Sequence, residues 1–392
     1  MMSARNEIAR PQGRLAALDG LRGVAALIVV FSHFCCAFLP RFVPALTDHP
    51  SWFADTPLGI LYNGTFSVSI FFVLSGFVVA RAAAKSRDPF YVNLPLRYLR
   101  LALPATASVI WAWGLLTLMP TAATHLNELR PSSWLMPNHV FQMQIPDIFH
   151  ALYHGLIEIY TTGGSRFNNV LWTMQIEAAG SMAIYLFYSV NNPRARKGLA
   201  IVIGLGTLLY PNYLCFVLGA WMMERWSAGK LKFGSPIAAL IAGILLGFPG
   251  RGFAQRLHIP YIWHTHGAFD IGNSSSLIAP LAAALILYSV LNLEYLQRLL
   301  SSRVPAYLGR VSFPLYLVHV PLLYTVFSVV YVWVKPTSSI FLLPLFVAFL
   351  GCSFALASAG EAWIDKPVLD GISQARKKLR AWRESKIELK PA

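Results

Sequence analysis

The sequence contains few charged residues for its length. Asp, Glu, Lys and Arg make up 12% of its 392 residues, whereas soluble domains carry about 25%. Hydrophobic residues make up 56% of the chain. This shortage of charge excludes an ordinary soluble protein, because such a protein needs a polar surface to face water. We therefore predict an integral membrane protein.

Cysteine is also scarce, and the four cysteines show no CxxC or similar ligand spacing. We therefore expect neither a disulfide framework nor a bound metal. Acidic residues are outnumbered by basic ones, which leaves a net charge of +15. The basic residues lie in short stretches between apolar runs. We interpret them as topology signals and contacts to the headgroups of membrane lipids, and we expect no binding of nucleic acid.

Long apolar runs divide most of the chain into candidate membrane-spanning helices, each of which needs about 20 mostly apolar residues. Ten runs are predicted to be such helices: 15–39, 58–82, 96–119, 170–190, 198–210, 212–226, 235–249, 277–293, 306–333 and 339–363. Three of the ten are short, and Pro211 divides two of these from each other. The first run is too long for the apolar part of a signal peptide, so we interpret it as a retained helix. A further helix at the membrane surface is expected near 147–161.

The distribution of basic residues predicts the topology. With ten spans and a cytoplasmic N-terminus, the loops on the cytoplasmic side contain several Lys and Arg each, whereas the long loops on the other side contain few. This alternation follows the positive-inside rule and places both termini in the cytoplasm. We predict an all-α bundle of about ten transmembrane helices. A cytoplasmic segment 1–14 precedes the transmembrane domain 15–367, and a basic cytoplasmic tail 368–392 follows it.

Ionisable side chains inside an apolar helix are candidate functional residues, because a charge in lipid is costly. The first predicted helix contains Asp19, Arg22 and His33. Asp19 precedes Arg22 by three residues, and we expect an ion pair between them. His33 follows Arg22 after close to three helical turns, so the two residues share one face, about 16 Å apart along the axis.

Two arginines and a glutamate form a second candidate set. Arg97 and Arg100 lie one helical turn apart at the cytoplasmic end of the third predicted helix. Their guanidinium groups are suited to binding a phosphate, although ordinary anchoring of the helix end is an alternative. Glu177 lies about 13 Å deep in the fourth helix, at a depth similar to that of His33. We expect Glu177 to be the partner of His33, which would make His33 an oriented general base.

Tyr316 and His319 lie one turn apart on the ninth predicted helix, and we expect them to line the same cavity. The alternative is a Tyr–His hydrogen bond that only holds the bundle together. All these residues together place cationic groups toward the cytoplasm and a His/Glu set deeper in the membrane. Two classes of protein fit this polarity: a transferase that uses acyl-CoA, or a proton-coupled transporter of an organic anion or small metabolite.

Six short motifs carry most of these residues. They are LDGLRG from Leu18 followed by His33, FFVLSGF from Phe71, Arg97-x-x-Arg100, LWT from Leu171 with Glu177, LGRVSFPLYLVH ending at His319, and DKP from Asp365. In this order, and over roughly 15–367, they resemble the motifs of the acyltransferase 3 family of integral membrane enzymes, which O-acylate sugars and related acceptors. The sequence departs from the family at Ala178, where many members have a second acidic residue.

The resemblance implies that an acyl group, expected to be acetyl, passes from acyl-CoA to a hydroxyl of a carbohydrate or lipid-linked glycan. It further implies that His33 is the catalytic base or a transient acyl carrier. Arg22, Arg97 and Arg100 would bind the phosphates of CoA or orient the thioester.

The resemblance leaves three roles open. We count Glu177 as catalytic, and Tyr316 and His319 as candidates for the substrate site. The expected protein is an O-acetyltransferase, located in a cell membrane or a bacterial inner membrane and active in polysaccharide modification.

Overall fold

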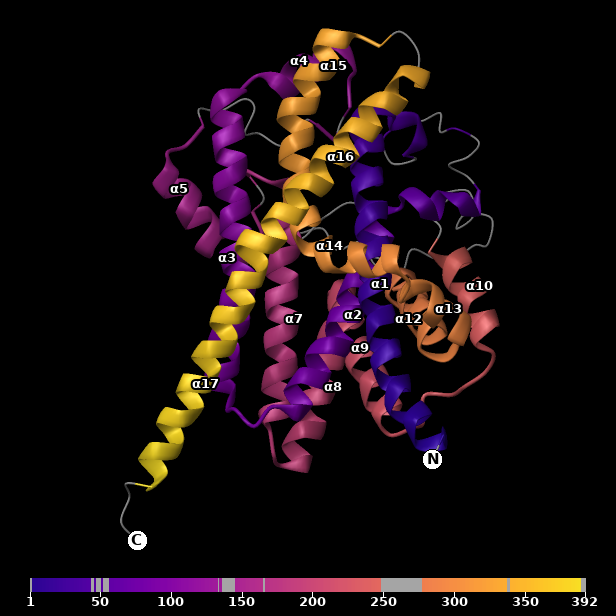
Figure 1. The fold of residues 1–392 in the computed structure, drawn as a ribbon, viewed down its shortest axis with the longest axis vertical. Coiled ribbons are helices and arrows are strands. Elements are labelled where there is room, and N and C mark those ends of the chain that lie inside the picture. Colours follow the sequence, from indigo (N-terminus) through magenta and orange to yellow (C-terminus); the bar gives the residue numbers. More distant parts are fainter. Residues whose placement is uncertain are drawn as a thin grey trace.

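The computed structural model describes residues 2–43, 46, 51, 56–132, 134–135, 145–164, 166–247, 277–336 and 339–388. All regular elements in these ranges are helices (Figure 1). The α-helices are α1 (Met2–Phe38), α2 (Gly64–Lys85), α3 (Phe90–Leu118), α4 (Ala122–Leu129), α5 (Ile148–Tyr153), α6 (Ile159–Thr161), α7 (Trp172–Ser189), α8 (Pro193–Leu209), α9 (Pro211–Ser227), α10 (Pro236–Leu246), α12 (Ile278–Asn292), α13 (Glu294–Leu300), α14 (Arg303–Leu322), α15 (Ser328–Val334), α16 (Leu342–Gly360) and α17 (Lys366–Glu388). Short 3-10 and π segments are η1 (Pro40–Phe42), η4 (Pro57–Tyr62), η6 (His154–Glu158), η7 (Asn169–Leu171), η8 (Leu323–Phe327), η9 (Ser339–Phe341) and η10 (Glu361–Asp365).

Each of the ten predicted runs corresponds to a helix or to consecutive helices, although the end of the run 235–249 lies outside the described residues. Within the described ranges, six helices are long and apolar enough to cross a membrane, and the pair α12 and α13, bent by 95°, makes a seventh if it is one broken span. The helices α8, α9 and α10 are shorter than these. Helix length therefore accounts for six or seven spans, fewer than the ten predicted.

Local sequence signals explain where several helices begin. The side chain of Asn63 accepts a hydrogen bond of 3.0 Å from the backbone N–H of Phe66 and so caps α2. Pro193, Pro211 and Pro236 each occupy the first position of a helix, where the missing N–H costs nothing. Pro211 thereby divides α8 from α9, as the sequence predicts.

The region near 147–161 is helical, as predicted, and consists of α5, η6 and α6. Phe149, Tyr153 and Ile157 are exposed at one-turn intervals along it. The buried ring of His154 contacts the carboxylate of Glu158 at 2.9 Å. Burial lowers the pKa of His154, against the opposing effect of this carboxylate. The segment therefore exposes apolar side chains on its outer side and packs Ala151 and Ile159 into the core on its inner side, where His154 and Glu158 form a polar contact.

Two hydrophobic clusters form the core. One contains Phe34 and Phe349 and joins the C-terminal half of α1 to α3, α14 and α16. The other contains Phe72 and Phe216 and joins the N-terminal half of α1 to α2, α9 and α12. Helices α2 and α9 cross so closely that a Cβ atom at Gly219 would lie 2.1 Å from the carbonyl oxygen of Val73. Glycine is needed there because no side chain fits.

The C-terminal residues continue α16 through η10 into α17, so the predicted basic tail is helical to Glu388. Arg380 of α17 donates two hydrogen bonds of 2.8 Å to the carboxylate of Asp88 in the α2–α3 connection. These bonds hold the pKa of Asp88 below its ordinary value, with Arg376 and Arg383 adding to the effect. The beginning of α1 and the end of α17 lie at the same end of the molecule (Figure 1).

Candidate functional site

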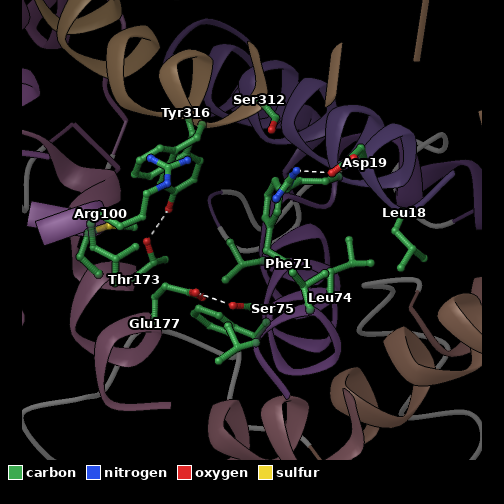
Figure 2. Close-up of a pocket in the computed structure, with 18 of the residues that line it drawn as sticks. Leu18, Asp19, Phe71, Leu74, Ser75, Arg100, Thr173, Glu177, Ser312 and Tyr316 are labelled. Atoms are coloured by element: carbon green, nitrogen blue, oxygen red, sulfur yellow. Dashed lines mark hydrogen bonds and ion pairs between the residues drawn. The ribbon is translucent and has the colours of Figure 1, made fainter. Parts of the chain in front are cut away.

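A cavity of about 180 Å³ opens between α1, α2, α3, α7 and α14. Figure 2 shows side chains from these helices converging on it. Its polar lining includes Asp19, Arg22, Ser75, Arg97, Arg100, Thr173, Glu177, Ser312 and Tyr316. We call it the arginine cavity. The three predicted arginines, Glu177 and Tyr316 thus meet in one place, whereas His33 and His319 are not among the described residues that line it.

Arg22 and Asp19 form the ion pair expected from their spacing, and both side chains are about half exposed. The glycines of the same motif have a packing role. A Cβ atom at Gly23 would lie 2.4 Å from the backbone nitrogen of Gly309, so only glycine lets α1 and α14 approach this closely. The motif therefore positions Arg22 beside α14 as well as supplying its charge.

Glu177 has partners other than the expected one. Its carboxylate accepts hydrogen bonds from the hydroxyl of Ser75 and the guanidinium of Arg97. The same Nη2 of Arg97 donates to the hydroxyl of Ser181 at 2.9 Å. The predicted pairing of Glu177 with His33 is therefore wrong: Glu177 faces the arginine cavity, where a cation neutralises it.

Arg100 is also paired, since its guanidinium donates to both oxygens of Asp365, in one case at 3.3 Å. Each of the three arginines consequently has a carboxylate partner, and together these six groups are formally neutral. Two buried donors of these arginines have no hydrogen-bond partner, the Nε atoms of Arg22 and Arg97. Buried donors without a partner are uncommon in folded proteins, so these two N–H groups are candidates for contact with a ligand or a bound water.

His33 and His319 lie against each other next to the cavity. Nδ1 of His33 and Nε2 of His319 are 2.8 Å apart, and the two rings are nearly parallel, with an angle of 8° between their planes. Nδ1 of His319 lies 2.9 Å from the carbonyl oxygen of Leu315. The ring of Trp134 stacks on His33 with centroids 5.2 Å apart. We call His33 and His319 the histidine pair.

Tyr316 connects the two features. It lines the arginine cavity, and its ring centroid lies 6.0 Å from that of His319 and 6.1 Å from that of Phe71. Its hydroxyl donates to the carbonyl of Val170 and contacts the hydroxyl of Thr173, both at 2.9 Å. Tyr316 is therefore fixed between the cavity and the histidine pair, and Figure 2 shows it above Thr173.

A proline supports the helix that carries these residues. Pro321 has no N–H to donate to the carbonyl of Leu317, one turn earlier. This carbonyl instead accepts bonds of 2.9 Å from the hydroxyl of Ser108 and 2.8 Å from the side-chain amide of Asn168. The carbonyl that Pro321 leaves free therefore links α14 to α3 and to Asn168, the residue before η7.

Sequence reasoning missed four residues that hold the site together. Ser75 lies in the FFVLSGF motif and Asp365 in the DKP motif, so their place in these motifs could have indicated them as site residues. Ser108 and Asn168 lie outside the motifs and carry no such signal. In the described part of the chain, no three His, Cys, Asp or Glu side chains are grouped to hold a metal ion.

Comparison with known proteins identifies relatives across most of the chain. O-acetyltransferase PaAT-1 of Phomopsis amygdali is 22% identical over 79% of this chain and 72% of its own length. A protein of Staphylococcus aureus strain MRSA252 named "Putative O-acetyltransferase" is 22% identical over 94% of this chain and 59% of its own length. Its counterpart in strain COL is 21% identical, and the match spans about half of that protein's length (49%). No solved structure is significantly similar to the chain.

The family comparison covers the arginine cavity and the histidine pair, whereas Asp365, the partner of Arg100, lies beyond the matched range. Residues 15–358 match the acyltransferase domain that defines the acyltransferase 3 family. This range contains every residue of the arginine cavity and the histidine pair. It also contains at least five of the six helices that are long and apolar enough to cross a membrane. The chain is therefore a membrane protein that belongs to the acyltransferase 3 family, a family of acyltransferase enzymes.

Proposed function

We propose that this protein transfers an acyl group from acyl-CoA to a hydroxyl of a carbohydrate or lipid-linked glycan. The expected acyl group is acetyl, because the relatives are named as O-acetyltransferases. The observation that carries the proposal is the adjacency of two features. An arginine-lined cavity suits the phosphates of a polyanionic substrate, and a histidine pair suits the removal of a hydroxyl proton.

In the proposed reaction, the acceptor oxygen forms a bond to the thioester carbonyl carbon while His33 accepts the hydroxyl proton. The carbon–sulfur bond then breaks, and the CoA sulfur takes the proton from His33 as it leaves. The products are an O-acyl ester and CoA, and His33 returns to its neutral form. Holding both substrates together beside His33 supplies much of the acceleration.

Arg22, Arg97 and Arg100 are proposed to bind the acyl-CoA. Because each has a carboxylate partner, binding uses the N–H groups that these partners leave over, such as the Nε atoms of Arg22 and Arg97. Glu177 is proposed to hold Arg97 in position rather than to assist His33. Tyr316 is proposed to form the wall between CoA and the acceptor.

We further propose a multi-pass protein of a cell membrane or bacterial inner membrane that acts in polysaccharide modification. About ten crossings place both termini in the cytoplasm. The shared end of α1 and α17 in Figure 1 supports an even number of crossings. The segment 1–14 and the tail 368–392 then lie on the cytoplasmic side of the acyltransferase domain 15–367.

The test is transfer of radiolabel from acetyl-CoA by the purified protein in lipid nanodiscs, with an oligosaccharide mixture as acceptor. We expect wild-type turnover, its loss in His33→Ala, and weaker acetyl-CoA binding in Arg97→Ala and Arg100→Ala. Label retained on the wild-type protein without acceptor, and absent from His33→Ala, would indicate an acyl-His33 intermediate. Full activity of His33→Ala would contradict the proposed base. Folded protein that neither binds nor turns over acetyl-CoA would favour the proton-coupled transporter, which uptake into proteoliposomes would then test.

A further inference from the structure

In the histidine pair, a backbone carbonyl determines which nitrogen donates and which accepts in each hydrogen bond. A carbonyl oxygen can only accept a hydrogen bond. The 2.9 Å contact between the carbonyl of Leu315 and Nδ1 of His319 therefore requires a proton on that nitrogen. Leu315 precedes His319 by one helical turn, so the helix itself supplies this acceptor.

The proton on Nδ1 of His319 determines the state of its other nitrogen. A second proton would make a cation of a side chain that is fully buried and faces a carbonyl and an imidazole. Such a cation in a membrane interior is costly. His319 is therefore neutral, its Nε2 has a free electron pair, and the 2.8 Å contact makes Nδ1 of His33 the donor.

We propose that His319 is the positioning residue that fixes the tautomer of His33, with the proton on Nδ1 and the basic electron pair on Nε2. The inference rests on the proposed function, in which His33 is the base. His319 would thereby orient the base through a neutral imidazole, in the role that a carboxylate has in other catalytic sets.

Two further contacts keep the ring of His33 in this orientation. Trp134 stacks on it with an angle of 26° between the planes, while His319 lies parallel to it at 8°. The hydrogen bond prevents the ring from flipping, since a flip would remove Nδ1 from its acceptor. When His33 accepts the hydroxyl proton on Nε2, its Nδ1–H becomes a charge-assisted donor to His319, which strengthens the bond.

The first part of the test compares two substitutions of His319. Phe fills a similar volume but cannot accept the bond, whereas the amide of Gln can accept from His33 and donate to the carbonyl of Leu315. We expect His319→Phe to lower kcat about 100-fold or more, with KM for acetyl-CoA changed less than about threefold. We expect His319→Gln to keep activity within about tenfold of wild type, because its amide oxygen can take the place of Nε2 and accept the bond from Nδ1 of His33.

Ser328→Ala is the matched control. Ser328 is buried on the same continuous helical segment, and its hydroxyl donates only a local bond of 2.8 Å to the carbonyl of Leu323. This variant loses a buried hydrogen bond without altering the histidine pair, so its kcat should stay within about threefold of wild type. Equal losses in Ser328→Ala and His319→Phe would overturn the proposal, because any damage to the helix would then have the same effect. Wild-type kcat in His319→Phe would also overturn it.

The second part reads the tautomer directly and does not depend on activity. Solid-state NMR of bilayer-embedded protein containing 15N-histidine distinguishes protonated from unprotonated ring nitrogens, and the spectrum of His33→Ala identifies the signals of His33. We expect Nδ1 of His33 to be protonated and Nε2 to be unprotonated near pH 7.5. A proton on Nε2 in the wild-type protein would overturn the proposal. If acyl transfer is absent but this tautomer is observed, the proposed function fails while the assigned role of His319 in orienting His33 stands.

Discussion

The arginine cavity and the histidine pair differ in how they keep polar groups stable inside the protein. In the cavity, each of the three arginines is balanced by a carboxylate. In the histidine pair, two neutral rings are linked to each other and to a backbone carbonyl. A charge requires a counter-charge when it is buried, whereas a neutral imidazole requires only uncharged partners, an acceptor for its N–H and a donor for its other nitrogen. Replacing one residue by alanine should therefore reduce stability more in the arginine cavity than in the histidine pair.

The largest effect on folding is expected from Arg97→Ala. It leaves Glu177, whose side chain is 14% exposed, without its cation. Breaking a fully buried ion pair on one side costs about 3–5 kcal/mol; because Arg97 and Glu177 are 20% and 14% exposed, we expect a loss at the lower end of that range. His33→Ala should abolish activity at a smaller cost in stability, because it leaves no charge behind. Thermal unfolding of both variants in the same detergent, beside activity assays, measures this contrast.

The double variant Arg97→Ala/Glu177→Ala is the control for this comparison. It removes both charges, so it should recover part of the stability lost in Arg97→Ala while remaining weak in acetyl-CoA binding. If Arg97→Ala and His33→Ala unfold at the same temperature, the contrast between the two regions is incorrect.

A smaller effect is expected from Tyr316→Phe, which alters the boundary between the regions. The substitution removes the hydroxyl bonded to Val170 and Thr173 but keeps the ring beside His319. We expect a loss of about 1 kcal/mol in stability and less than tenfold in kcat. Tyr307→Phe on the same helix loses an exposed bond to Ser358 and should change neither quantity measurably. A loss as large as that of His33→Ala would mean that the Tyr316 hydroxyl takes part in the chemistry.

The smallest effect is expected at Asp88, where a similar ion pair lies outside the predicted spans. Asp88→Asn should lower stability by about 1 kcal/mol or less: the carboxylate is 2% exposed, but the three arginines that bind it are 33–45% exposed, so solvent screens the attraction. The pKa of Asp88 is lowered in the folded state, so its contribution is present above about pH 4 and is lost as the pH falls through the lowered pKa. The difference in melting temperature between wild type and Asp88→Asn should thus be constant from pH 7 to about pH 5 and shrink below about pH 4. Asp370→Asn, at an exposed position of α17, is the control, and an equal effect there would contradict the assigned role of Asp88.

The sequence predicted the helices well because apolar runs, prolines and caps act locally. It also predicted the Asp19–Arg22 pair, since both partners lie on one helix. The number of spans did not follow in the same way, because α8 and α9, with 17 residues each, and α10, with 11, are shorter than the roughly 20 residues of a typical membrane crossing.

Partners on different helices were harder to predict. The pairing of Glu177 with His33 was based on similar depth, but depth leaves open which way each side chain points around its helix axis. The contact of Arg100 with Asp365 joins residues 265 positions apart, and nothing in the spacing of either motif indicates it. The gathering of the arginines in one cavity nevertheless agrees with the sequence prediction that all three lie toward the same side of the membrane.

The carbonyl of Leu317, which Pro321 leaves without a partner in its own helix, has a mechanical consequence. Ser108 and Asn168 both donate to it, and Asn168 also bonds to Ser108, so α3, α14 and the residue before η7 are cross-linked at one level of the bundle, two residues before His319. Helices linked in this way cannot slide past one another at that level without breaking buried hydrogen bonds. The register of α14 against α3 is therefore fixed close to the point where α14 presents His319 to His33.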